Sequence, residues 1–460
     1  MNVLQQMKLF MEPKSVALVG LTRNTGDGAF NVMENLLSYG YQGNMFPINP
    51  STREILGIRT YASVLDIPEP ADLAIIGTPR NLVPNLLMEC NQRGIRSAVV
   101  FAQGFADATD NEGHHLHQQM INVIRTTGIR VVGPNTFGTA NAFINFSSSF
   151  FRQQLKRRPI GIICQSGMFY IGFPELVLTG KGMDIGNGCD IQFIEGLQYF
   201  EDDPQIKVVA LHIEGMEDPT KFIGVARKVA KKKPIIALKT GRGEKSARAA
   251  ESHTGSLTGS DNIWETALTQ AGAIRMSELQ ELIDIARAFS ILPPIQNPNT
   301  GVATLSGALG IMTLDASQHT DIKLEKLSLQ TRKSIEAISP PWLRISNPVD
   351  IWPAMMSSPD IIQPLVKGLN TLLSDPQLGA VLFIGAAFDD KWVISLTQFL
   401  TDLANQHPEK ALACCLYGPA GDDVIKELQE AGKVAAYPTP ERAIRALARV
   451  YEYSLLRSTL

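Results

Sequence analysis

Short apolar runs alternate with longer amphipathic segments along the first third of the chain. The run Ser15–Gly20 (SVALVG) is typical of a buried strand, and the segment Ala29–Tyr39 that follows it has helical spacing. Alternation of this kind predicts a parallel sheet with helices on both of its faces. The other strand-like runs in this part of the chain are Asn44–Ile48, Leu73–Thr78, Ser97–Phe101 and Ile129–Gly133.

The same alternation occurs twice more. A second cycle ends in a long helical pattern at Glu278–Leu292, and a third ends in a helix at Pro440–Leu456. Both cycles therefore predict further parallel sheets. Their strand-like runs are Pro159–Cys164, Val208–Ile213 and Pro234–Lys239, and then Gly301–Leu305, Ala380–Ile384 and Ala411–Leu416.

Two segments without either periodicity separate these cycles. The polar, basic stretch Ser147–Arg158 indicates a linker, and the segment Pro293–Thr300, rich in proline and asparagine, indicates a second boundary. A length of 460 residues fits about three domains at roughly 150 residues each. We expect three α/β domains, at residues 1–146, 159–292 and 300–460.

The composition indicates which kinds of partner and which cellular compartment to expect. A net charge of −3 at pH 7 gives no reason to expect nucleic acid or an anionic membrane as a partner. No apolar run approaches the roughly 20 residues that span a bilayer, and the first residues lack the pattern of a secretory signal. The five cysteines have no metal-ligand spacing, which favours a reducing compartment. We expect a cytoplasmic protein without a metal site of its own.

The loops that follow the predicted strands of the first domain carry candidate ligand contacts, because ligands of open parallel sheets bind at the carboxyl ends of the strands. The loop Gly20–Gly28 (GLTRNTGDG) combines glycines, which allow close backbone approach, with the Thr22 and Thr25 hydroxyls and the charge of Arg23. Its spacing matches neither a dinucleotide fingerprint nor a Walker loop, and an ordinary strand–helix turn explains it about as well. Further polar loops at strand ends favour a nucleotide-like ligand: Asn49–Arg53, Thr78–Arg80, Gln103–Phe105 and Gly133–Gly138.

A second candidate site surrounds His253 in the segment Ala249–Asp261 (AAESHTGSLTGSD). Small neighbours leave the imidazole accessible, and a neutral imidazole can accept and pass on a phosphoryl group. Glu214, at the end of a predicted strand, could orient that ring, and Ser166 with Gly167 could present amides to an anion. Taken singly, these residues are better explained by a flexible turn, a solvated glutamate and an ordinary helix cap.

The order of these segments along the chain indicates a family more specifically than any single segment does. The chain resembles the alpha subunit of ADP-forming acetate–CoA ligases, which are relatives of succinyl-CoA synthetase. The resemblance covers nearly the whole chain. It is carried by PKSVALVG, YGYQGNMFPINP, DIPEPADLAIIGTP, GIRVVGPNTFG, CQSG, EDDPQIKVVALHIEG, KKKPIIALKTGR, AAESHTGSLTGSD and NPVDIW.

The resemblance implies a fold and a reaction. The first domain would be a Rossmann-like CoA-binding domain, and two flavodoxin-like ligase domains would follow it. The implied enzyme interconverts acyl-CoA, phosphate and a nucleoside diphosphate with carboxylate, CoA and a nucleoside triphosphate through a phosphohistidine. By the same resemblance His253 is the phosphorylated residue, Glu214 supports it, and Ser166 and Gly167 stabilise phosphate. The residues matching the CoA-facing loops are Gly20, Thr22, Arg23, Asn49, Pro50, Thr78, Pro79, Gly133, Pro134 and Asn135.

The resemblance also implies a partner, because no ATP-grasp segment is found before residue 460. We expect a separate ATP-grasp beta subunit that carries ATP or ADP with Mg²⁺, and therefore a hetero-oligomer. The substrate would be a small carboxylate or its acyl-CoA.

Three departures from the family pattern keep an alternative open. Thr136 stands where the family usually has cysteine, Cys164 stands where it has serine, and the stretch Leu178–Asp190 is shortened. The shortened stretch raises the alternative of a non-catalytic CoA-binding or regulatory protein. A nicotinamide-dependent dehydrogenase is disfavoured, because Gly20–Gly28 lacks the required glycine spacing.

Overall fold

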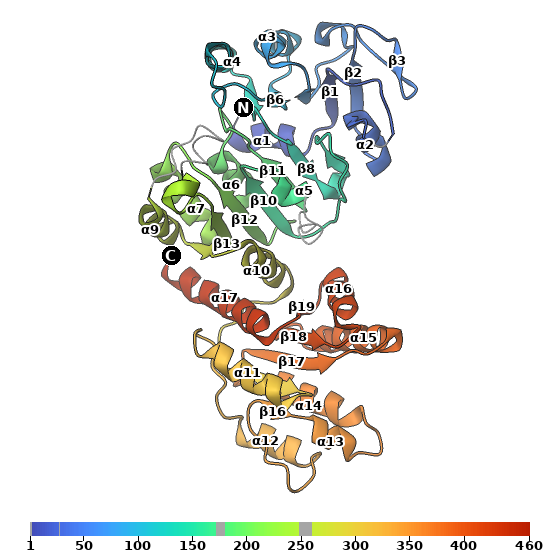
Figure 1. Ribbon diagram of the computed structural model, residues 1–460, viewed down its shortest axis with the longest axis vertical. Helices are drawn as coiled ribbons and strands as arrows, with labels where there is room; N and C mark the ends of the chain where they lie inside the picture. The colour runs from blue at the N-terminus through green and yellow to red at the C-terminus, as the bar shows by residue number, and fades with distance from the viewer. Residues whose placement is uncertain (1, 27, 172–179, 248–259) are drawn as a thin grey trace. The chain divides into compact units, whose positions relative to one another are not determined.

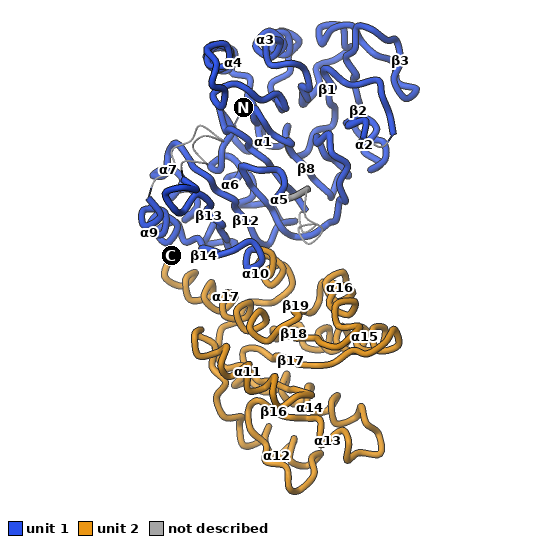
Figure 2. The backbone as a smooth tube through the Cα atoms, viewed as in Figure 1, with its two compact units in different colours: residues 1–282 blue, residues 283–460 orange. Residues whose placement is uncertain are grey.

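The computed structural model of the chain describes residues 2–26, 28–171, 180–247 and 260–460. They form two compact units that divide between residues 282 and 283 (Figure 2). Unit 1 contains two large sheets and unit 2 contains one, in the chain order shown in Figure 1. The mixed α/β class with parallel sheets agrees with the alternation in the sequence.

The first sheet of unit 1 has five parallel strands in the order β2-β1-β5-β6-β7. Each strand lies within a run that the sequence predicted, to within one or two residues at its ends. The central strands are apolar and wholly buried, since helices cover both faces of a sheet built from parallel crossovers. The strands are β1 Ser15–Val19, β2 Asn44–Ile48, β5 Leu73–Ile76, β6 Ser97–Val100 and β7 Arg130–Val132.

The second sheet of unit 1 has the order β14-β13-β12-β10-β11-β8-β9. Its first five strands in that order are parallel, whereas β8 pairs antiparallel with both β11 and β9. Residues 139–147, most of which lie before the predicted boundary at 146, thus extend the second sheet. The strands are β8 Thr139–Asn141, β9 Phe146–Ser147, β10 Ile160–Cys164, β11 Lys181–Asp184, β12 Val208–Ile213, β13 Ile235–Lys239 and β14 Ala273–Met276.

The start of the predicted linker Ser147–Arg158 belongs to the packed interior. Ser147, Ser148 and Ser149 are fully buried. The Ser148 hydroxyl accepts a hydrogen bond from the Thr139 amide at 2.8 Å and so fastens this segment to β8. A run of three serines reads as solvated in a sequence, but here their hydroxyls bond to backbone and to neighbouring side chains.

Unit 2 contains the third large sheet, which is parallel and has the order β16-β15-β17-β18-β19. Leucine, isoleucine and valine side chains from its strands and helices form its core. The strands are β15 Thr300–Thr304, β16 Val349–Asp350, β17 Ala380–Ala386, β18 Ala411–Tyr417 and β19 Ala435–Tyr437.

Helices connect the strands of all three sheets, and within the described ranges no helix has the length and apolar character needed to cross a membrane. Those of unit 1 are α1 Val3–Met11, α2 Val32–Tyr39, α3 Val83–Arg93, α4 Asn111–Thr127, α5 Met168–Ile171, α6 Phe193–Glu201, α7 Pro219–Ala230 and α9 Asp261–Ala271. Helix α10, Leu279–Ile291, spans the division between the units. Those of unit 2 are α11 Gly307–Ser317, α12 Leu329–Glu336, α13 Trp352–Met356, α14 Gln363–Leu373, α15 Asp390–Gln406, α16 Gly421–Ala431 and α17 Pro440–Thr459.

The three sheets share one strand order. Numbered along the chain within each sheet, the parallel strands lie in the doubly wound order 2-1-3-4-5. The chain leaves the first strand toward one side and returns on the other, so a crevice opens between the ends of the first and third strands. These switch points lie between β1 and β5, between β10 and β12, and between β15 and β17.

Candidate functional site

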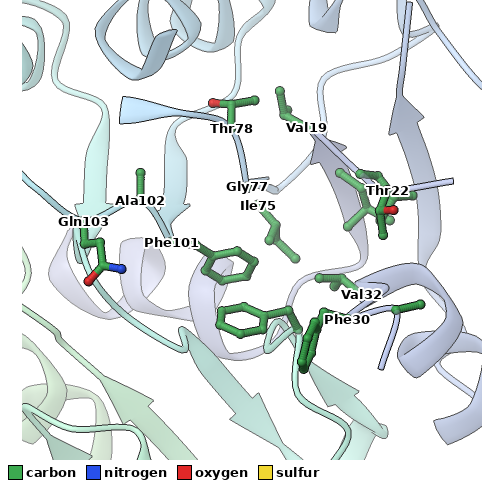
Figure 3. Close-up of a pocket in the computed structure, with 15 residues that line it drawn as sticks. Val19, Thr22, Phe30, Val32, Ile75, Gly77, Thr78, Phe101, Ala102 and Gln103 are labelled. Atoms are coloured by element: carbon green, nitrogen blue, oxygen red, sulfur yellow. The ribbon is translucent and has the colours of Figure 1, made fainter. Parts of the chain in front are cut away.

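A cavity of about 380 Å³ lies at the switch point between β1 and β5 (Figure 3). Its wall comes from the carboxyl ends of β1, β5 and β6 and from the start of α2. Three of the predicted CoA-facing residues, Gly20, Thr22 and Thr78, line it. The full lining is Leu18, Val19, Gly20, Leu21, Thr22, Ala29, Phe30, Val32, Ile75, Gly77, Thr78, Phe101, Ala102, Gln103 and Phe150.

The backbone at the cavity requires glycine. Gly20 has a φ of +78°, and a Cβ added there would lie 2.6 Å from Thr78 Cγ2. The two loops therefore approach each other more closely than any other residue at position 20 allows. The Thr78 hydroxyl oxygen is buried and has no hydrogen-bond partner among the described residues.

Hydrogen bonds from two asparagines fix the loop after β1. The buried Asn31 donates through Nδ2 to the carbonyl oxygens of Thr22, at 3.0 Å, and Asn24, at 3.1 Å. Asn49, predicted as a CoA contact, donates through Nδ2 to the Leu21 carbonyl at 3.2 Å, so it supports the loop. The other predicted residues of these loops, Arg23, Pro50 and Pro79, are exposed and do not line the cavity.

The loop containing Gly133, Pro134 and Asn135 packs against the segment that follows β11. The Gly133 and Pro134 carbonyls accept hydrogen bonds from the amides of Cys189 and Asn187, at 3.1 and 3.0 Å. These three predicted CoA contacts therefore join the first sheet of unit 1 to the second, and none of them lines the cavity.

An aromatic cluster that the sequence did not predict borders the cavity. It consists of Phe30, Phe101, Phe137, Phe150 and Phe151, whose rings meet mostly edge to face at centroid distances of 4.8 to 6.1 Å. Two of its members belong to the predicted linker. The two adjacent phenylalanines inside the stretch predicted as a linker were the sequence signal that could have indicated this cluster.

The second switch point joins the ends of β10 and β12. Gln165, directly after β10, accepts through Oε1 from the amides of Glu214, at 2.6 Å, and Gly215, at 3.0 Å. Lys239, at the end of β13, donates through Nζ to the Glu214 carbonyl at 2.9 Å and lies 5.2 Å from the Trp264 ring centroid. Burial lowers the pKa of Lys239 to about 8. The backbone of Glu214 is thus held from both sides, by two residues that the sequence analysis did not assign.

A buried histidine lies beside this switch point. The His212 ring stacks on Phe169 at 3.8 Å between centroids, and its Nε2 is 3.1 Å from Thr240 Oγ1. Burial, reinforced by the nearby Lys239, lowers the pKa of His212 to about 3, so the ring is neutral at physiological pH.

The turn of Ser166 and Gly167 follows β10 and packs tightly against Phe137, in the loop between β7 and β8. A Cβ added to Gly167 would lie 2.2 Å from Phe137 Cδ2. The phosphate-binding role of these residues stays a prediction, because α5 contributes only four described residues after the turn.

The three departures from the family pattern have different structural outcomes. The Thr136 hydroxyl donates to the Asp184 carbonyl and accepts from the Gly138 amide, so threonine is satisfied there. Cys164 is buried in β10, and its Sγ is 3.7 Å from the Met183 carbonyl. Of the shortened stretch, residues 181–184 form β11 in register with β10. His253 and residues 178–179 lie outside the described residues.

Comparisons with known proteins agree with this architecture. The family described as CoA binding domain matches residues 14–142, and the family described as succinyl-CoA ligase like flavodoxin domain matches residues 157–289. Acetate–CoA ligase [ADP-forming] I subunit alpha of Pyrococcus furiosus is 33% identical over 97% of this chain and 98% of its own length. Acetate–CoA ligase [ADP-forming] of Methanocaldococcus jannaschii is 34% identical over 98% of this chain, which spans 64% of that longer protein.

The likeness extends to three dimensions. The dinucleotide forming acetyl-coenzyme A synthetase 1 of Ca. Korarchaeum cryptofilum, solved in complex with phosphate and ADP, superposes with a TM-score of 0.88 at 29% identity. The match covers 98% of this chain and 97% of that one. The chain therefore belongs to the family of alpha subunits of ADP-forming acetate–CoA ligases.

Proposed function

We propose that this chain is the alpha-type subunit of an acid–CoA ligase that forms a nucleoside diphosphate. The observation that carries the proposal is the cavity at the β1–β5 switch point, where Gly20 allows close approach of the loops after β1 and β5. This is where a doubly wound sheet binds a nucleotide-like ligand. Gly20, Thr22 and Thr78 would hold CoA, while Asn49 and Asn31 keep their loops in place.

The proposed chemistry proceeds in three transfers. Phosphate attacks the thioester carbonyl of acyl-CoA, the C–S bond breaks, and CoA leaves as the acyl phosphate forms. An imidazole nitrogen of His253 then attacks phosphorus, and the carboxylate leaves with the electrons of the broken P–O bond. The phosphohistidine finally transfers its phosphoryl group to a nucleoside diphosphate. Glu214 would accept a hydrogen bond from the other ring nitrogen and so direct the attacking lone pair.

The nucleotide would bind to another polypeptide. The P. furiosus relative is named as an alpha subunit, and the M. jannaschii relative is longer than this chain. An ATP-grasp beta subunit carrying ATP or ADP with Mg²⁺ is the partner that this division implies. A small carboxylate, or its acyl-CoA, is the substrate class that we propose.

Phosphorylation in the presence of the candidate partner tests this function. Incubation with γ-labelled ATP should give acid-labile, alkali-stable label on the wild-type chain and none on His253→Ala. Absence of label from the wild type, or equal label on the variant, would contradict the proposal. CoA binding measured by calorimetry without any phosphate transfer would instead support a non-catalytic CoA-binding protein.

A further inference from the structure

A buried carboxylate connects the two switch points of unit 1. Asp184 ends β11 and is only 2% exposed. It has no ion-pair partner among the described residues, and its carboxylate accepts hydrogen bonds from backbone amides. Burying an ionisable group without a counter-ion disfavours its charged form. Burial accordingly raises the pKa of Asp184 to about 6.

The amides that bond to the Asp184 carboxylate belong to two different loops. Asp184 Oδ2 accepts from the Phe137 amide at 2.7 Å, and Oδ1 accepts from the Gly186 amide at 3.1 Å. The turn after β10 connects to this carboxylate through Phe137, because a Cβ added to Gly167 would lie 2.2 Å from Phe137 Cδ2. In addition, the Asp184 amide donates to the Gly138 carbonyl at 2.9 Å. One side chain thus holds the loop after β7 and the loop after β11 together, and it holds Phe137, against which the Ser166–Gly167 turn packs.

Close packing also holds the loop after β7, the loop after β11 and the Ser166–Gly167 turn together. A Cβ on Gly186 would lie 2.4 Å from the carbonyl oxygens of Pro134 and Asn135, and a Cβ on Gly167 would overlap the Phe137 ring. That ring lies 5.3 Å from Phe150, which lines the cavity. A continuous path of contacts therefore runs from the cavity wall through Phe137 and Asp184 to the turn predicted to receive phosphate.

We infer that Asp184 is a positioning residue for phosphoryl transfer, which holds the Ser166–Gly167 turn at a fixed place relative to the CoA cavity. This inference rests on the proposed function. Asp184 does not itself line the cavity, so it acts through the amides that it binds. An anion that binds only amides can hold several loops at once, because a carboxylate offers about four acceptor positions.

The variant Asp184→Asn tests the inference with little change in volume. One acceptor oxygen becomes an NH₂ group, which cannot accept from the Phe137 or Gly186 amide. With the holoenzyme, ATP, a carboxylate substrate and CoA, we expect kcat for phosphate release to fall at least tenfold, while KM for CoA changes less than threefold. Hydrogen exchange at residues 136–138 and 165–167 should accelerate. A matched control is Asp375→Asn, since Asp375 is 3% exposed in unit 2 and should leave kcat within twofold.

A milder variant covers the case in which Asp184→Asn does not fold. Thr136→Val removes one hydroxyl donor to Asp184 and should lower kcat three- to tenfold. A wild-type kcat in a folded Asp184→Asn enzyme, or a lower kcat with unchanged exchange at 136–138 and 165–167, would overturn the inference. Absence of label from the wild type would instead refute the proposed function, and the two failures are therefore distinguishable.

Discussion

Replacement of Gly20 by alanine tests the cavity directly. The new Cβ would lie 2.6 Å from Thr78 Cγ2 and 3.0 Å from the Gly77 carbonyl carbon. Carbon atoms in contact prefer about 3.5–4.0 Å, so Thr78 or the Gly77 backbone must move by about 1 Å. The left-handed backbone at φ +78° adds about 1–2 kcal/mol of strain for alanine.

A second glycine in the same domain separates these two effects. Gly57, between β3 (Glu54–Ile55) and β4 (Ile58–Arg59), has a φ of +77°, and no heavy atom lies within 4 Å of its added Cβ. Gly57→Ala should therefore lose similar stability from backbone strain alone. Only Gly20→Ala should move Thr78, and we expect its CoA affinity to fall at least tenfold, which is about 1.4 kcal/mol.

Isothermal titration of both variants with CoA, alongside urea unfolding, makes the comparison. Gly57→Ala should bind CoA within twofold of the wild type. Wild-type affinity in Gly20→Ala, or equal weakening in both variants, would refute the assignment of CoA to the β1–β5 cavity.

Two further predictions concern the buried ring at the second switch point and the aromatic wall. Because the pKa of His212 is lowered to about 3, the folded protein binds fewer protons than the unfolded chain between about pH 3 and 6.5, so stability is lost as pH falls through that window. The loss of unfolding free energy is up to about 5 kcal/mol. Urea unfolding at several pH values should show that this free energy depends less on pH in His212→Gln than in the wild type. An equal dependence on pH in both proteins would contradict this prediction. Phe150→Leu should cost about 1–3 kcal/mol of stability and weaken CoA binding at least threefold, because Phe150 contacts four other rings and lines the cavity. Phe151 does not line the cavity, so Phe151→Leu should keep CoA affinity within twofold of the wild type. If calorimetry shows the same loss of CoA affinity in both variants, the position of Phe150 in the cavity wall is not the cause.

Most of the parallel strands were predictable because they are buried on both faces and form continuous apolar runs, but β11, β14, β16 and β19 were not among the predicted runs. Strands such as β1 and β12 match their predicted runs closely. The residues Gly20, Thr22 and Thr78 could be nominated for the same reason, since loops at strand ends follow from the strands themselves. The family could also be identified from the sequence, because the motifs occur along the chain in the order typical of that family.

Other features depended on contacts between segments far apart in the sequence. Strands β8 and β9 are three and two residues long and pair antiparallel, so they have no recognisable apolar run. Ser147–Ser149 were predicted as part of a linker, because nothing in the neighbouring sequence shows that their hydroxyls form hydrogen bonds within the protein. Asp184 and Lys239 are charged residues at the ends of buried strands, and only the fold shows that both are themselves buried.

The pairing of β8 with β11 has a consequence for dividing the protein. A cut near residue 147 would appear to separate two domains, yet it would remove β8 and β9 from the second sheet. Strand β11 would then become an edge with unpaired amides and carbonyls, and such edges recruit other chains and promote aggregation. A fragment beginning at residue 159 should therefore associate or precipitate, whereas a fragment beginning at residue 139 keeps its own edge protected. The smallest separable piece of the ligase region includes these nine residues, 139–147.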